Sequence, residues 1–356
     1  MVIISSMKRI PVGILGATGS VGQKFVELLQ NHPWFEITAL AASERSAGKR
    51  YGDSVHWIQQ TPISSNIANM QIQPCQPDLP CRMVFSGLDS GVAGEVETSF
   101  ANAGYFVFSN SKNHRMDPDV PLLVSEINSD HLQLLQKQPY KGAILTNPNC
   151  SATGLVLVLK PLLDRFGLES VHVVTMQALS GAGFPGVSSL SILDNVIPFI
   201  SDEEEKVESE PLKILGEYKN GSIRNLDLKI SAQCNRVSVF DGHTECVSVK
   251  LSRTTSEEEI IREWNEFSGE PQELKLPSAP VKPIHYLPEK DAPQPRLHRN
   301  VEKGMAVTIG RLRPCNLLDY KFVLLSHNTI RGAAGGAILN AELLVKKKLF
   351  PHELEI

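Results

Sequence analysis

Apolar runs, turns and amphipathic stretches follow one another regularly in the first 150 residues. Residues 10–15 are mostly apolar, residues 16–22 are rich in glycine, and residues 23–30 have the spacing of an amphipathic helix. This succession predicts a buried strand, a tight turn and a helix. Similar apolar runs, each followed by small or polar residues, recur at residues 35–42, 83–87, 105–108 and 143–145. These repeated units favour an α/β domain of the Rossmann-like type.

The pattern changes after Gly154, where looser alternation replaces the strand and helix units. Runs at residues 171–179, 229–239 and 244–251 predict strands of a mixed, largely antiparallel sheet. Asp241 and Gly242 lie between the last two runs and favour a hairpin there. An acidic start at residues 202–205 predicts a helix, because carboxylates are favoured at helix N-termini. We therefore expect a second domain of the α+β class.

The glycine-rich turn at residues 16–22 suits the phosphates of a dinucleotide. Glycines permit a tight turn, let the backbone approach a pyrophosphate and leave helix N–H groups pointing at it. The spacing GxxGxxG departs from the common GxGxxG, and a purely structural turn is the alternative. The position in the first strand and helix unit favours dinucleotide binding. The predicted contacts are Gly16, Thr18, Gly19, Ser20 and Val21.

The residues after the second strand indicate which dinucleotide is bound. NAD sites commonly place an acidic residue there for the ribose hydroxyls, whereas a 2′-phosphate favours arginine and hydroxyl donors. Ser43, Arg45 and Ser46 therefore argue for NADP, provided that the side chain of Glu44 points away. A solvated basic loop is the alternative. Ser86, in the turn after a later strand, is expected at the edge of the nicotinamide pocket.

A polar loop at residues 109–116 follows the strand predicted at residues 105–108. Open α/β sheets bind ligands at the carboxyl ends of their strands. Lys112, His114 and Arg115 therefore suggest an anion site in this loop, with a merely solvated loop as the alternative.

Cys150 is the candidate nucleophile of the chain. It lies in a polar turn between the apolar run at residues 143–145 and an apolar helix that begins near residue 150. Asn149 or Ser151 can cap that helix, which places Cys150 at its N-terminus. Backbone N–H groups and the helix dipole favour an anion there, so we expect a lowered pKa and attack as a thiolate. A small buried cysteine without chemistry is the alternative.

Length, charge and cysteine usage restrict the possible partners and the compartment. The 356 residues allow two domains, and a net charge of −4 gives no reason to expect nucleic acid or an anionic membrane as partner. The six cysteines form no CxxC pair, and their spacing predicts neither a metal site nor a disulfide framework. We expect no signal peptide, because the apolar patch within residues 1–7 is too short for one, and no membrane span, because no apolar stretch reaches about 18 residues. A reducing cytoplasm fits best.

Taken in order, these features resemble those of the aspartate-β-semialdehyde dehydrogenases. The sequence motifs are similar to those of the archaeal and fungal branch of that family. The resemblance spans nearly the whole chain. It rests on GATGSVG at 16–22, SNSKNHR at 109–115, NPNCS at 147–151, QALSGAGFPG at 177–186, EPLKIL at 210–215, NRVSVFDGH at 235–243 and a terminal helix from Asn328. It implies NADPH-dependent conversion of β-aspartyl phosphate to aspartate semialdehyde and phosphate, on the route to lysine, methionine and threonine.

The resemblance also implies roles for single residues. Cys150 would attack the acyl phosphate and form a thioester. His243 would pass protons to and from the thiol and the tetrahedral intermediates, and Gln177 would orient the substrate. Arg236 would hold the α-carboxylate through its guanidinium fork, which requires an irregular segment if both it and His243 are to face one site.

The remaining assignments concern the amino group, the phosphate and the coenzyme. Glu210 would bind the α-amino group, and Lys213, Arg115 and Asn149 would bind phosphate. A second Glu-x-x-Lys pair, Glu203 and Lys206, leaves an alternative open, although the apolar residues after Lys213 favour the first pair. The coenzyme contacts would extend to Ser180, Gly181, Gly183 and Asn328.

The expected domain organisation follows from these assignments. We predict an NADP-binding domain at residues 1–150, completed by a C-terminal helix at residues 328–356, and a catalytic and dimerisation domain at residues 151–327. The resemblance implies a homo-oligomer, either a homodimer or a homotetramer, formed through the second domain.

Four other functions compete with this one. N-acetyl-γ-glutamyl-phosphate reductase and malonyl-CoA reductase share the fold, the cysteine and NADP. The first is disfavoured because an acetylated amine has no need of Glu210, whereas the second stays open. A cysteine and histidine hydrolase has no use for the glycine-rich turn, and a non-catalytic NADP-binding protein has none for Cys150.

Overall fold

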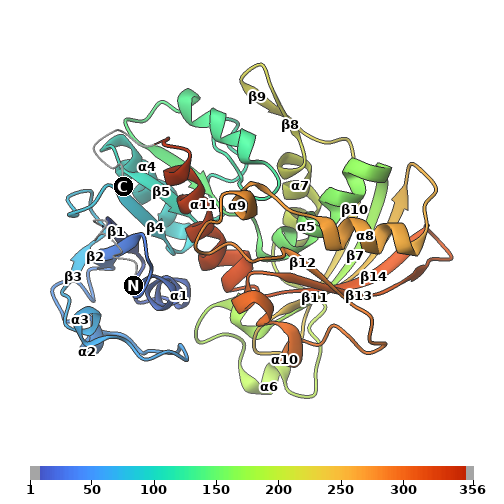
Figure 1. Ribbon diagram of the computed structural model, residues 1–356. Coiled ribbons are helices and arrows are strands. Elements are labelled where there is room, and N and C mark those ends of the chain that lie inside the picture. The colour runs from blue at the N-terminus through green and yellow to red at the C-terminus, as the bar shows by residue number, and fades with distance from the viewer. Residues whose placement is uncertain (1–8, 350–356) are drawn as a thin grey trace, which may run out of the picture. The chain divides into compact units, whose positions relative to one another are not determined.

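The computed structural model describes residues 9–349, and within them the chain forms two compact units (Figure 1). The first unit contains residues 9–121, 132–147 and 337–349, and the second contains residues 122–131 and 148–336. The longer segment of the second unit begins at Pro148 and includes Cys150, slightly earlier than the predicted boundary after residue 150, and residues 122–131 of the predicted first domain also belong to the second unit. Residues 350–356 of the predicted C-terminal helix lie outside the described residues.

The first unit is built on a parallel six-stranded sheet, and the Rossmann-like prediction is confirmed. All five neighbouring pairs run parallel, in an order that reverses direction between β1 and β4. The strands in spatial order are β3 (Ile72–Pro74), β2 (Phe35–Ala42), β1 (Ile10–Leu15), β4 (Met83–Ser86), β5 (Phe106–Ser109) and β6 (Ala143–Thr146). Such a reversal creates the crevice in which doubly wound folds bind dinucleotides.

Three short strands of this sheet are completely buried. Every residue of β4, β5 and β6 is buried, as expected for strands covered on both faces. Helices α1 (Ser20–Leu29) and α4 (Ser90–Asn102) connect consecutive strands. A side chain at Gly22 would come within 2.1 Å of the Gly16 carbonyl oxygen, so only glycine lets α1 approach the turn so closely.

The C-terminal helix α11 (Gly335–Lys346) contributes its residues from Ala337 onward to this unit. Asn340 donates to the side chain of Asn147 over 2.8 Å, and Nε2 of His32 lies 2.7 Å from the Glu342 carboxylate. Backbone N–H groups donate to Nδ1 of His32, so Nε2 carries the proton and donates to Glu342. These contacts join the end of the chain to its beginning within one core.

The second unit is built on a mixed six-stranded sheet, which confirms the predicted class. Its outer pairs, β10 with β7 and β13 with β12, run parallel, and its three inner pairs run antiparallel. The strands in spatial order are β10 (Lys229–Arg236), β7 (Leu168–Gln177), β11 (His243–Leu251), β14 (Tyr320–Ser326), β13 (Val307–Pro314) and β12 (Ile284–Leu287).

The predicted hairpin at Asp241 and Gly242 is wrong. Strands β10 and β11 do not pair with each other, because β7 lies between them. Gly242 does adopt a positive φ of 99°, so the local preference for a turn is satisfied. Residues 237–242 instead cross the end of β7 and bond to it and the loop that follows, for example from Val237 N to the Gln177 carbonyl over 3.0 Å. Turn residues specify a reversal of the chain, but sheet pairing decides which strand becomes the neighbour.

Three helices pack against the second sheet: α5 (Cys150–Phe166), α7 (Glu203–Ile214) and α8 (Glu257–Glu266), seen together along one side of it in Figure 1. Trp264 of α8 is fully buried and donates to the Val158 carbonyl of α5 over 3.0 Å. On the opposite face, Cys246 is exposed and its strand neighbours Val174 and Val323 are only half-buried. One face of this sheet therefore forms a core and the other remains partly open.

Short elements complete the fold. They are α2 (Tyr51–Ser54), α3 (Ser65–Ala68), η1 (Ser129–Lys137), η2 (Leu179–Ala182), α6 (Ser189–Ile192), β8 (Glu217–Lys219), β9 (Ser222–Arg224), α9 (Glu270–Glu273), α10 (Pro295–His298), η3 (Val301–Gly304) and η4 (Ile330–Ala334). Among residues 9–349, no helix combines the length and the apolar character needed to cross a bilayer.

Candidate active site

Cys150 is the first residue of α5, as the sequence predicts. The side-chain oxygen of Asn149 accepts the N–H groups of Ser151 over 2.9 Å and Ala152 over 3.1 Å, so Asn149 is the N-cap. The prediction that Asn149 or Ser151 caps the helix is thereby confirmed for Asn149. The thiol is half-buried and lies where the helix dipole favours a negative charge.

His243 is the direct partner of this thiol. Its Nε2 lies 3.1 Å from Sγ of Cys150, although the two residues are far apart in the sequence. Nδ1 accepts the backbone N–H of Ala178 over 3.0 Å. Complete burial, together with the positive charges of Arg236 and His327, lowers the pKa of His243 to about 3. The ring is therefore neutral at physiological pH.

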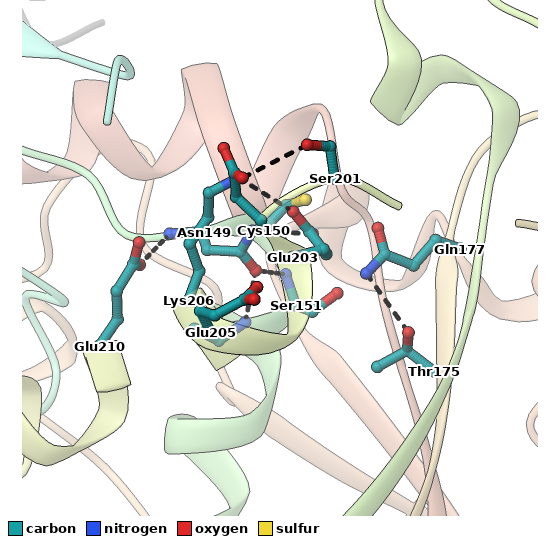
Figure 2. Close-up of polar contacts among 12 residues, drawn as sticks. Asn149, Cys150, Ser151, Thr175, Gln177, Ser201, Glu203, Glu205, Lys206 and Glu210 are labelled. Atoms are coloured by element: carbon teal, nitrogen blue, oxygen red, sulfur yellow. Dashed lines mark hydrogen bonds and ion pairs between the residues drawn. The ribbon is translucent and has the colours of Figure 1, made fainter. Parts of the chain in front are cut away.

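Arg236, Gln177 and His243 lie side by side across three strands. Arg236 pairs with Gln177 in the parallel β10 and β7 ladder, and the β11 register places His243 on the other side of Gln177. Arg236 and His243 reach one site because they occupy strands that flank β7, and not through an irregular segment within a single strand. Gln177 donates to Thr175 over 3.3 Å (Figure 2). Sheet register thus gathers three of the predicted residues.

The loop after β7 fits closely between Arg236 and His243. Nη1 of Arg236 donates to the Ala178 carbonyl over 2.7 Å. A Cβ at Gly181 would lie 2.9 Å from that Nη1 and 3.1 Å from Cε1 of His243. Gly181, a predicted coenzyme contact, thus has a steric role here because any side chain would displace these groups.

Glu203 and Glu210, the glutamates of the two Glu-x-x-Lys pairs of α7, both contact Asn149, as Figure 2 shows. Glu210 accepts the backbone N–H of Asn149 over 2.5 Å, and Glu203 accepts its side-chain amide over 2.8 Å. Lys206 lies 3.5 Å from Glu203, and Lys213 is buried one turn beyond Glu210. Residues spaced by seven share a helix face, so both glutamates can hold Asn149, the residue that precedes Cys150.

Glu245 is a buried acid that sequence reasoning missed. It lies two residues beyond His243 on β11, is completely buried, and has no hydrogen-bond partner for either carboxyl oxygen within the described part of the chain. Burial and the negative charge of Glu203 raise the pKa of Glu245 well above its usual value. The alternation of β11 could have indicated an inward-facing acid, because His243, Glu245 and Val247 share one side of the strand.

We expect the Glu245→Gln variant to become more stable, relative to the wild type at the same pH, as the pH rises. The folded chain holds the Glu245 proton more tightly than the unfolded chain, whose carboxyl has a pKa of about 4.3. Wild-type stability should therefore fall by about 1.4 kcal/mol per pH unit above that value, until Glu245 ionises in the folded state. Urea unfolding of both proteins between pH 5 and pH 8 measures the difference. Glu169→Gln, at an exposed position, is the control. If the unfolding free energies of the Glu245→Gln variant and the wild type differed equally at every pH, the raised pKa of Glu245 would not be the cause.

The predicted coenzyme contacts of the first unit lie at the carboxyl ends of its strands. Gly16 follows β1 with a positive φ of 72°, and α1 begins at Ser20 without a side-chain cap on its first N–H groups. Ser43 and Arg45 follow β2 and are exposed. Helix N–H groups that lack a cap and an exposed arginine at the same sheet edge fit a dinucleotide with a 2′-phosphate. Thr18, Gly19, Val21 and Ser46 belong to these same two turns.

Ser86 is the last residue of β4, and its place at the edge of the nicotinamide pocket stays a prediction. It is fully buried, and its hydroxyl donates to Glu97 over 2.6 Å, while Ser109 donates to the same oxygen over 2.8 Å. Glu97 thus joins the ends of β4 and β5 beneath the polar loop at residues 110–116. In that loop the buried Arg115 donates to the Asn110 carbonyl over 2.8 Å. No sequence signal identifies Glu97, because it lies in the middle of α4.

Ser180 and Asn328 are bonded to each other within the second unit. The side-chain amide of Asn328 donates to Ser180 over 2.8 Å, and its oxygen accepts the N–H of Gly242 over 2.9 Å. Asn328 therefore connects the loop after β7, which also contains Gly183, with the turn before His243. Coenzyme contact by these residues stays a prediction.

Comparisons with known proteins agree with this arrangement. Residues 11–135 match the family model described as semialdehyde dehydrogenase, NAD binding domain, and residues 159–331 match semialdehyde dehydrogenase, dimerisation domain. The aspartate-semialdehyde dehydrogenase of Archaeoglobus fulgidus is 49% identical over 96% of this chain and 99% of its own length. That of Schizosaccharomyces pombe is 50% identical over 95% of this chain and 98% of its own.

Solved structures give the same result. The aspartate semialdehyde dehydrogenase of Candida albicans with NADP has a TM-score of 0.89 and 44% identity, covering 96% of this chain and 100% of that one. Aspartate semialdehyde dehydrogenase II of Vibrio cholerae complexed with ASA has a TM-score of 0.76 and 25% identity, covering 96% and 99%. Full-length identity of this extent, together with the paired Cys150 and His243, shows that the chain belongs to the aspartate-semialdehyde dehydrogenase family.

Proposed function

We propose that the chain catalyses the NADPH-dependent reductive dephosphorylation of β-aspartyl phosphate to aspartate semialdehyde, in the biosynthesis of lysine, methionine and threonine. The observation that carries this proposal is the half-buried thiol of Cys150, 3.1 Å from His243 at a helix N-terminus, in a chain of this family. Thiolate attack on the acyl phosphate expels phosphate and leaves a thioester on Cys150. Bound NADPH supplies the hydride that reduces the thioester.

The other predicted substrate-binding residues have chemistry suited to the rest of the substrate. Arg236 is assigned to the α-carboxylate because its guanidinium can donate two parallel hydrogen bonds. Glu210 is assigned to the α-amino group, and Lys213, Asn149 and Arg115 to phosphate. Gln177 orients the reacting carbonyl. Glu203 and Lys206 remain the alternative pair, since Glu203 also contacts Asn149.

The proposal assigns a different role to each of the two units. The first unit binds NADP through the turns after β1 and β2, and the second carries the catalytic residues. The six cysteines form no disulfide, which supports a reducing cytoplasm as the compartment.

The assay that tests this function uses the purified protein with aspartate semialdehyde, phosphate and NADP, followed by NADPH absorbance. Phosphate-dependent reduction of NADP is the expected result. Parallel assays with malonyl-CoA and NADPH, and with N-acetyl-γ-glutamyl phosphate and NADPH, test the two related reductases. Activity with malonyl-CoA alone would overturn the assignment.

We expect a preference for NADPH over NADH that depends on Arg45. The exposed guanidinium has the charge and geometry to bind a 2′-phosphate, and a charged hydrogen bond contributes about 1.5 to 3 kcal/mol. Arg45→Ala should therefore lower kcat/KM for NADPH by about tenfold or more and leave that for NADH nearly unchanged. Exposed Arg224→Ala, in the second unit, is the matched control. Equal catalytic efficiency of the wild type with both coenzymes would contradict the assignment.

We infer that a second copy of the chain covers the open face of the second sheet, giving a homodimer. Cys246 is exposed in the middle of this face, and the half-buried Val174 and Val323 lie beside it. An antiparallel sheet normally keeps polar residues on its solvent face, so apolar ones there indicate an interface. The matched dimerisation model covers these strands.

Cys246→Arg is therefore expected to raise the dimer dissociation constant by about tenfold or more, because it buries a charge without a partner. Sedimentation velocity over a concentration series measures the change. Val92→Arg, at an exposed apolar residue of the first unit, should leave the dimer intact. An unchanged dimer in the Cys246 variant would place the interface elsewhere.

A further inference from the structure

Glu97 is a fully buried acid in the middle of α4, and the proposed function does not use it. Its helix packs against β5 in the first unit (Figure 1). One carboxyl oxygen accepts the hydroxyl of Ser86, the last residue of β4, over 2.6 Å and the hydroxyl of Ser109, the last residue of β5, over 2.8 Å. Burying a carboxyl group is costly, so its position at two adjacent strand ends requires a physical reason.

The hydrogen bonds of Ser109 run in one direction. The backbone N–H of Ser111 donates to the Ser109 hydroxyl oxygen over 3.0 Å, and a peptide nitrogen can only donate. The hydroxyl proton of Ser109 then points to Glu97, which supplies the acceptor oxygen. Glu97 therefore holds the Ser109 hydroxyl in the orientation that receives the N–H of Ser111. Consecutive hydrogen bonds of this kind strengthen one another.

The peptide between Asn110 and Ser111 extends these bonds to Arg115. Its N–H donates to Ser109, and its carbonyl, that of Asn110, accepts Nη2 of Arg115 over 2.8 Å. In a planar trans peptide the N–H and C=O groups point in opposite directions. Holding the N–H on Ser109 therefore directs the carbonyl toward the Arg115 guanidinium. We call Glu97, Ser109, this peptide and Arg115 the Glu97 network.

The Glu97 network needs an acceptor oxygen at Glu97 and not a negative charge. Burial raises the pKa of Glu97, while the bonds from Ser86 and Ser109 and the charges of His114 and Arg115 oppose that rise. A neutral carboxyl group keeps one oxygen that can accept both hydroxyls, and so does an amide. A negative charge would also repel a phosphate bound at Arg115. Glutamine should therefore replace Glu97 better than an apolar residue of similar size.

We propose that Glu97 is a positioning residue for phosphate binding, which acts through Ser109 and the peptide between Asn110 and Ser111 to hold the guanidinium of Arg115 in place. The proposal rests on the proposed function, which assigns Arg115 to phosphate. Because Glu97 is fully buried, it acts on phosphate only through these groups. Its effect should appear in the KM for phosphate and much less in the KM for NADP.

Steady-state kinetics with aspartate semialdehyde, phosphate and NADP test this role. Ser109→Ala interrupts the Glu97 network without changing Ser86, and it should raise the KM for phosphate by about fivefold or more while the KM for NADP changes by less than about twofold. Glu97→Leu should raise the KM for phosphate at least as much, and Glu97→Gln should keep it within about threefold of the wild type. Glu95→Leu, at an exposed position of the same helix, is the matched control. An unchanged KM for phosphate in Ser109→Ala, or equal effects of leucine and glutamine at Glu97, would overturn the proposal.

Combining Ser109→Ala with Arg115→Ala separates this proposal from the proposed function. Arg115→Ala alone should raise the KM for phosphate by about tenfold or more, because a charged hydrogen bond is lost. In that background Ser109→Ala should have little further effect, since the group that it positions is absent. If Arg115→Ala left the KM for phosphate unchanged, the assignment of Arg115 to phosphate would fail, and the role of Glu97 with it. If Ser109→Ala had its full effect in both backgrounds, the assignment of Arg115 would stand and the positioning role of Glu97 would be wrong.

Discussion

Cys150→Ser is expected to lower kcat/KM by at least about 10²-fold, because it removes the nucleophile on which the thioester forms. A serine hydroxyl at the same helix terminus stays protonated near neutral pH, whereas a thiol ionises readily there. NADP binding should survive, since the coenzyme contacts assigned to the first unit are not altered. Phosphate-dependent NADP reduction and a fluorescence titration with NADPH measure the two properties separately.

Cys315→Ser is the control for cysteine replacement in the second unit. Cys315 is half-buried like Cys150 but lies in the connection between β13 and β14. Its replacement should leave activity unchanged. If the Cys150 variant retained full activity, the covalent mechanism would be wrong.

Arg331→Met is expected to destabilise the protein by about 3 to 5 kcal/mol, the cost of leaving a buried charge without its partner. Arg331 and Glu126 form a bidentate pair with distances of 2.7 Å and 2.5 Å, and their side chains are 2% and 0% exposed. This pair holds residues 122–131 against η4 within the second unit. Urea unfolding near pH 7 measures the loss.

The double variant Arg331→Met with Glu126→Leu separates charge from packing. It removes both charges while keeping apolar volume, and such replacements are often close to neutral. We expect it to recover most of the lost stability, which a double-mutant cycle expresses as coupling between the two sites. A double variant as unstable as the single one would show that packing, and not the unpaired carboxylate, is the cause.

The residue that follows Arg331 lies beside Cys150 in the candidate active site. Gly332, next to Arg331, lies so close to Cys150 that an added Cβ would meet the Cys150 Cβ at 2.7 Å. The backbone of η4 therefore lies directly against Cys150. The sequence around Arg331 does not indicate this contact or the pairing of Arg331 with Glu126, because the fold brings together segments that are far apart in the sequence.

Local sequence patterns predicted correctly the structural features that arise from neighbouring residues. The cap at Asn149 and the helix that begins at Cys150 depend on neighbouring residues, and the structure has both. The glycine-rich turn and the strand ends of the first sheet follow from short-range geometry in the same way. The hairpin at Gly242 failed because it depended on strand pairing, and β7 separates the two strands.

By itself, the sequence of this protein determined the fold class and the family and singled out Cys150 as the candidate nucleophile, because motifs and hydrophobic spacing are local or repeat along the chain. Tertiary structure alone decided that Arg236, Gln177 and His243 stand in one row and that Glu203 and Glu210 both hold Asn149. It also decided that the Ala178 N–H occupies Nδ1 of His243 and that Glu245 is buried without a partner in the described chain. Pairing register and burial arise from contacts between segments that are far apart in the sequence, which is why local patterns did not predict them.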